Sequence, residues 1–131
     1  MTIKVTRLPD EPVIIYTYPE YIRSEQEVRD ALNAASSYKM GHGSDIYIVH
    51  DASRLKLDFS QMLTTLATLV RETPNPQDLP RMRFYAVGSD EMVRRAAMYT
   101  AQDQYGNLDV SMVDTLDAAL DDIHTRMGAA E

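Results

Sequence analysis

The sequence contains no cysteine and no tryptophan. Without cysteine the chain can form no disulfide, thiolate metal site or iron–sulfur cluster, and it has no cysteine nucleophile. This composition fits a reducing cytoplasm, which is the location we expect. The sequence also lacks an apolar run long enough to span a bilayer, and residues 1–10 lack the apolar core of a signal peptide. We therefore expect neither a membrane segment nor export.

Positive charge is scarce as well. The 13 lysines and arginines are outnumbered by 20 aspartates and glutamates, which gives a formal net charge of −7. A negative chain repels phosphate backbones and anionic lipids over long range, so nucleic acids and membrane surfaces are not expected partners. The histidines, His42, His50 and His124, do not lie at the spacing of metal ligands. The sequence therefore predicts no metal site and no cofactor.

The motifs of common catalytic sites are also missing. Gly41-His42-Gly43 lacks the Gly-Lys-Ser/Thr ending of a phosphate-binding loop, and no serine lies in a Gly-x-Ser-x-Gly elbow. A phosphoaspartate at Asp51 would need a lysine after a late strand, and the sequence places none there. We find no convergent set of ionisable groups and expect no enzymatic activity.

The 131 residues that are present, 44% of them hydrophobic, suffice for one sizeable core, so we expect a single domain over residues 1–131. Apolar residues recur at strand or helix spacing along the whole chain. Strands are predicted at residues 3–8, 13–18, 46–49, 82–87 and 108–113, and helices begin near residues 24, 58, 90 and 114. Asp58 with Gln61 forms a capping-box spacing, and Asp114 is the expected cap of the last helix.

This order, β-β-α-β-α-β-α-β-α, predicts an α/β fold with a mixed, mostly parallel sheet of about five strands and four helices. The first two strands are separated by a proline-containing turn and should form an antiparallel hairpin. Ile46–Val49 is continuously apolar, as expected of a central strand that is buried on both faces.

Three segments carry a resemblance to a known family. Ile46–Ser53 reads IYIVHDAS, Asp58-Phe59-Ser60 opens a helix, and Val113–Leu120 reads VDTLDAAL. Together with the order of elements, they resemble the STAS domain of anti-sigma-factor antagonists and sulphate transporters. That family has a central strand ending in aspartate, an Asp-Ser-Ser/Thr-Gly motif and a closing φ-D-T-L-x-x-A-L segment. Phe59 and Gln61 replace the first hydroxyl and the glycine of the motif, so the chain is similar to a divergent member.

The resemblance implies a non-catalytic protein-interaction module whose partner is a kinase-like anti-sigma factor. In the antagonists that partner phosphorylates the second hydroxyl residue of the motif, and Ser60 matches this position. A helix start also suits a phosphate physically, because its free N–H groups and its dipole stabilise negative charge. The alternative interpretation is that Ser60 is an ordinary first-turn residue.

A second interpretation is a small ligand-binding or catalytic α/β domain. Asp51 and Ser89 follow two of the predicted parallel strands, and ligands of α/β sheets bind at the carboxyl ends of such strands. Asp58 is a further candidate in the same loops. Asp51 can equally well serve to order the loop of residues 52–57.

Tyrosine and methionine are the remaining unusual feature, with eight residues of each. Tyr16, Tyr18 and Tyr21 cluster at the end of the predicted hairpin, and Met98 and Tyr99 lie off the main apolar stripe of the third helix. Tyrosine is favoured at interfaces because it combines a large contact area with a polar tip. We therefore expect a homo-oligomer that uses one of these two surfaces.

Overall fold

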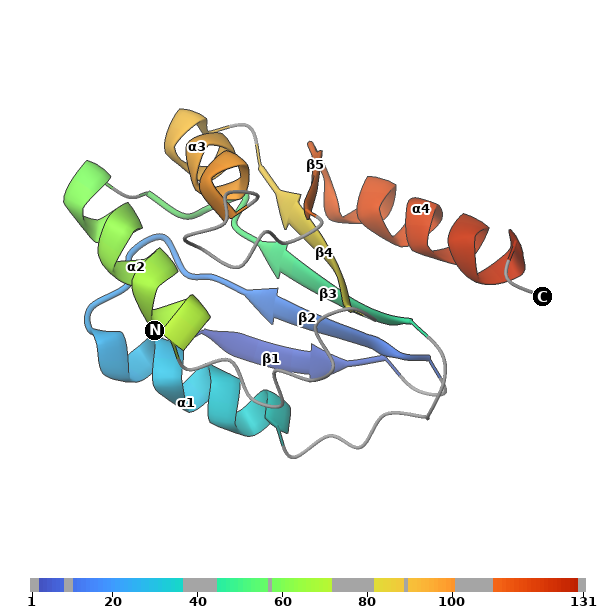
Figure 1. Cartoon of the computed structure of the whole chain (residues 1–131), viewed down its shortest axis with the longest axis horizontal. Helices are drawn as coiled ribbons and strands as arrows, with labels where there is room; N and C mark the ends of the chain where they lie inside the picture. Colours follow the sequence, from blue (N-terminus) through green and yellow to red (C-terminus); the bar gives the residue numbers. More distant parts are fainter. Residues whose placement is uncertain are drawn as a thin grey trace.

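The computed structural model describes residues 3–8, 11–36, 45–56, 58–71, 82–88, 90–100 and 110–129. These residues form one five-stranded sheet and four helices (Figure 1). In chain order the elements are β1 (Lys4–Arg7), β2 (Val13–Thr17), α1 (Glu25–Ser36), β3 (Ile46–Asp51), α2 (Phe59–Arg71), β4 (Met82–Val87), α3 (Glu91–Thr100), β5 (Val110–Val113) and α4 (Leu116–Ala129). The predicted α/β fold with a mixed sheet is confirmed.

The strands lie in the sheet in the order of the chain, β1-β2-β3-β4-β5. β1 pairs antiparallel with β2, and every other pair is parallel. When successive parallel strands advance in one direction, right-handed connections place all connecting helices on the same face. α1, α2 and α3 lie on one face, whereas α4, which follows the last strand and connects nothing, covers the other (Figure 1).

β3 is the central strand, as predicted, and it supplies both cores. Ile46 and Ile48 point into the core beneath α1 and α3, while Tyr47 and Val49 point into the core beneath α4. Successive side chains of a strand face opposite sides, so a strand covered on both faces has to be apolar throughout. This explains the uninterrupted apolar run of Ile46–Val49, in which every residue is buried.

The helix starts agree with the sequence at α2 and differ at α4. The Gln61 N–H donates to Asp58 Oδ1 at 2.7 Å and the Asp58 N–H donates to Gln61 Oε1 at 3.1 Å, which is the predicted reciprocal cap. The prediction of Asp114 as the cap of α4 is wrong. Thr115 Oγ1 accepts the Ala118 N–H at 3.1 Å, because the helix begins one residue later than expected.

α4 is fastened to the sheet by a polar cluster. The fully buried Tyr85 donates its hydroxyl proton to Asp122, and Arg126 Nε lies 3.1 Å from the same carboxylate. The guanidinium of Arg126 also sits 5.6 Å from the centroid of the Tyr85 ring. Burial, followed by the bond to Asp122, raises the pKa of Tyr85, so this hydroxyl remains a donor. Within the described residues, none of the four helices has the length and apolar content that crossing a bilayer requires.

Candidate functional site

Asp51, a predicted ligand or partner residue, lies at the carboxyl end of β3. Its Oδ1 accepts both the Ser53 N–H at 3.2 Å and the Ser53 hydroxyl at 2.7 Å. An aspartate that bonds the backbone two residues ahead forms a turn of its own. The carboxylate therefore orders the loop between β3 and α2, as one of the two sequence interpretations held.

His50, the residue before Asp51, is enclosed by aromatic rings. Its ring stacks on Tyr16 with centroids 4.9 Å apart and lies 6.4 Å from Phe84. Burial lowers the pKa of His50 to about 4 and raises the pKa of Tyr18, so at neutral pH the imidazole is uncharged and the phenol keeps its proton. The Tyr18 hydroxyl and His50 Nδ1 are hydrogen-bonded at 2.7 Å.

The expectation of an exposed tyrosine cluster is wrong for Tyr16 and Tyr18. Their side chains are 5% and 4% exposed, because they point to the same face of the sheet as Ile14, into the core beneath α1. Burial also raises the pKa of Tyr16 to about 12. Tyr21 and Met98, by contrast, are 58% and 60% exposed. Ser89 and the side chain of Tyr99 lie outside the described part of the chain.

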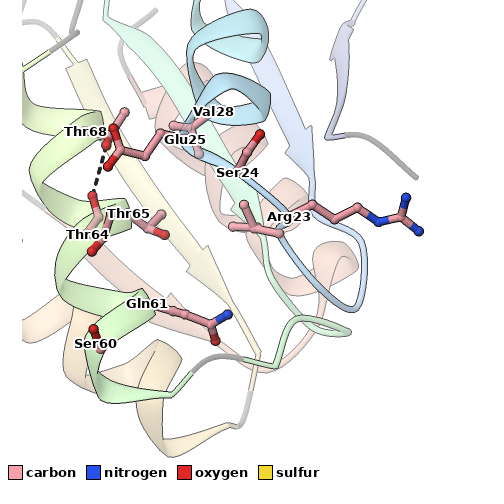
Figure 2. A pocket seen from close by; sticks show the side chains of 10 residues that line it. Arg23, Ser24, Glu25, Val28, Ser60, Gln61, Thr64, Thr65 and Thr68 are labelled. Carbon is pink, nitrogen blue, oxygen red and sulfur yellow. Dashed lines mark hydrogen bonds between the residues drawn. The ribbon is translucent and has the colours of Figure 1, made fainter.

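Ser60 lies at an open pocket between the start of α1 and one side of α2 (Figure 2). The pocket has a volume of about 250 Å³. Its wall combines the residues around the start of α1 with one side of α2, namely Ile22, Arg23, Ser24, Glu25, Val28, Ser60, Gln61, Thr64, Thr65 and Thr68. The exposed Ser60 therefore shares a concave surface with a segment that is distant in sequence.

The α2 wall of this pocket is rich in hydroxyl groups. Ser60, Thr64 and Thr68 recur at intervals of four residues and thus follow one side of the helix. Thr68 is fully buried, and its hydroxyl donates to the Thr64 carbonyl at 3.0 Å. Ser60 was predicted from the sequence and the threonines were not, although their spacing of four residues is visible in the sequence.

Two charged residues line the pocket, and their side chains point in different directions. Arg23 lines the pocket, but its side chain extends away from it, whereas Glu25 reaches toward α2 (Figure 2). Glu25 Oε2 also pairs with Arg29 at 3.0 Å. Asp58 is exposed at the cap, two residues before Ser60. Because Ser60 is itself exposed, negative charge added to it would lie on the molecular surface.

The start of α2 is joined to the loop before α1. Lys56 Nζ lies 3.0 Å from Glu20 Oε1, and the Lys56 N–H donates to the Glu20 carbonyl at 2.8 Å. This contact brings Tyr21 to the same end of the molecule as Phe59, which is 47% exposed. Tyr21, Phe59 and Ser60 together are called the α2-start surface below.

Among the described residues, no three histidine, aspartate or glutamate side chains gather in a way that could hold a metal ion. No family model matches the chain, and no curated protein matches it. The geometry of the α2-start surface is therefore the basis on which function is inferred.

Proposed function

We propose that the chain is a STAS-like, non-catalytic interaction module that binds a protein partner at the α2-start surface and is controlled by phosphorylation of Ser60. The resemblance of the sequence to anti-sigma-factor antagonists suggests a kinase-like anti-sigma factor as the partner, acting in the cytoplasm. The observation that carries the proposal is the exposed position of Ser60 on the first turn of α2, where a kinase can reach its hydroxyl.

The physical argument for a switch rests on where the new charge would lie. A phosphate adds roughly −1.5 to −2 charges at neutral pH. The dipole of α2 stabilises a charge at its start by a few tenths to about 1 kcal/mol, and the exposed Asp58 opposes it. The fold should therefore tolerate the modification. A partner bound to Phe59 and Ser60 would then contact a negatively charged phosphate in place of a neutral hydroxyl.

The alternative function, ligand binding or catalysis by the loops near Asp51 and Ser89, receives less support. Asp51 Oδ1 is already occupied by two hydrogen bonds from Ser53. His50 is uncharged and packed between aromatic rings, so it is poorly placed for acid–base chemistry.

The test is quantitative affinity capture from the source cells with four forms of the protein as bait. These are the parent, Ser60→Ala, Ser60→Asp and the control Ala118→Asp, which adds the same charge at an exposed position of α4. The parent, Ser60→Ala and Ala118→Asp should capture the same partner. The affinity of Ser60→Asp for that partner should be lower by about tenfold or more, which corresponds to about 1.4 kcal/mol of binding free energy. Equal retention by Ser60→Asp would refute the switch.

A further inference from the structure

The two edges of the sheet differ in their chemistry. β1 carries Lys4 and Arg7, and charged side chains are a common protection against edge-to-edge pairing. β5 has the sequence VSMV, with no charge, proline or glycine. Within the described residues, β5 pairs with β4 alone. In the described part of the chain, no strand lies against the outer edge of β5, which leaves that edge available for pairing with another strand.

The hydrogen bonds of β5 indicate which backbone groups point outward. The Gly88 N–H donates to the Val113 carbonyl at 3.0 Å, so the polar groups of Val113 face β4. Backbone groups alternate in direction along a strand, so those of Ser111 also face β4. The N–H and C=O groups of Val110 and Met112 consequently point to the outer edge.

Exposed apolar side chains accompany this edge. Met112 is opposite Ala86 in the register of β4 and β5, which places its side chain on the face of the sheet that α3 covers. Met112 is 47% exposed, and Met98 on the neighbouring α3 is 60% exposed (Figure 1). Methionine is a flexible side chain that adapts to contact surfaces.

The charges on this side of the molecule are balanced. Arg94 on α3 pairs with Asp114 just after β5 at 3.1 Å, and Arg95 pairs with Glu91 at 2.8 Å. The chain as a whole has a net charge of −7 and repels its own copies. These ion pairs offset one another's charge beside β5, so the local charge opposes a second copy less than the net charge of the chain would suggest.

We infer that β5 pairs antiparallel with β5 of a second copy about a twofold axis, so that two sheets join into one. Antiparallel pairing of a strand with itself is self-complementary, as a twofold interface requires. An axis perpendicular to the sheet keeps both α3 helices on the same face, where Met98 and Met112 of each copy can meet. This interface is independent of the function proposed for Ser60.

The test is the molar mass in solution, measured by light scattering and sedimentation, for the parent and for edge variants. The parent should show twice the chain mass of 14.8 kDa. Met112→Pro removes an outward N–H and leaves the bonds to β4 in place, so it should weaken self-association by about tenfold or more while the circular dichroism spectrum stays unchanged. Met112→Lys keeps the N–H but charges the edge, and should act in the same direction if the proline variant folds poorly.

The matched control lies on the opposite edge. The Leu8 N–H donates to the Val13 carbonyl, and the alternation along β1 then turns the N–H of Arg7 outward. Arg7→Pro should leave the dimer intact. A parent of monomer mass at the highest concentration reached, or a dimer that resists both Met112 variants, would overturn the inference.

Discussion

His50 illustrates how burial decides the behaviour of one titratable side chain. The imidazole lies between Tyr16 and Phe84 and is hydrogen-bonded to the buried Tyr18. Protonation would introduce a charge into this buried aromatic environment, which burial disfavours. His50 is therefore part of the core beneath α1, and its protonation makes the stability of the fold depend on pH.

We predict that the free energy of unfolding decreases between pH 6.5 and pH 4. The pKa of His50 is about 4 in the fold against an ordinary value of 6.5. The unfolded chain therefore binds the proton more tightly, and the contribution of His50 is complete above pH 6.5 and lost as the pH falls toward 4. The loss amounts to about 3 kcal/mol. Denaturant unfolding at several pH values measures it.

His50→Asn supplies the control for this effect. Asparagine can donate or accept a hydrogen bond near the position of Nδ1 and does not titrate, so the acid slope between pH 6.5 and pH 4 should become shallower. An unchanged slope in His50→Asn would show that other groups cause the acid sensitivity.

Gly88 is a second residue whose environment dictates its identity. Its φ of +145° is unfavourable for residues with a side chain, and an added Cβ would lie 3.2 Å from the Ala52 carbonyl oxygen. Gly88→Ala should therefore reduce the free energy of unfolding by about 1–3 kcal/mol. Gly128→Ala is the control, since nothing lies within 4 Å of its added Cβ, and it should leave stability unchanged or raise it by up to about 1 kcal/mol. Equal effects of the two changes would contradict this account.

At the scale of the secondary-structure element, two neighbouring residues at the start of α4 have different roles. Thr115 caps the helix, and Asp114 pairs with Arg94 at the surface. Thr115→Ala should lower the free energy of unfolding by about 1 kcal/mol. Asp114→Ala should change it much less, because exposed ion pairs contribute little. Chemical denaturation of both variants tests the assignment, and the reverse ranking would show that Asp114 is the cap.

The elements were largely predictable because their apolar periodicity is strong. β4 was predicted with the bounds that it has, and the reciprocal cap of α2 by Asp58 and Gln61 was predicted from their spacing. The cap of α4 was missed because Asp114 and Thr115 are both good capping residues, and spacing alone does not distinguish adjacent candidates. Tyr16 and Tyr18 were assigned to the surface because composition favours tyrosine there, whereas the alternation of β2 sends both into the core.

At the scale of the whole molecule, the pocket beside Ser60 could not be predicted from the pattern of elements in the sequence. The pocket beside Ser60 arises where α1 and α2 are placed on the same face of the sheet. Their lateral placement follows from the strand order, which the element pattern restricts but does not determine. The sequence therefore indicated Ser60 as a single residue, and only the fold shows that the side of α2 with Ser60, Thr64 and Thr68 lines a pocket with the start of α1.

Two surfaces of the molecule are thus assigned to different interactions. The α2-start surface carries the proposed partner contact, and the β5 edge with α3 carries the inferred contact between copies. They use different elements, so a substitution at Ser60 should not alter the molar mass, and one at Met112 should not alter partner capture. Phosphorylation could then control the partner without dissociating the dimer.

The central claim, that Ser60 is a phosphorylation switch, is tested most directly by mapping phosphates on the protein purified from its own cells. Quantitative mass spectrometry should find a single phosphate on Ser60, in a fraction of molecules that changes with growth conditions. The unphosphorylated fraction should be the one that copurifies with the partner. Release of the partner under conditions in which Ser60 carries no phosphate would contradict the account.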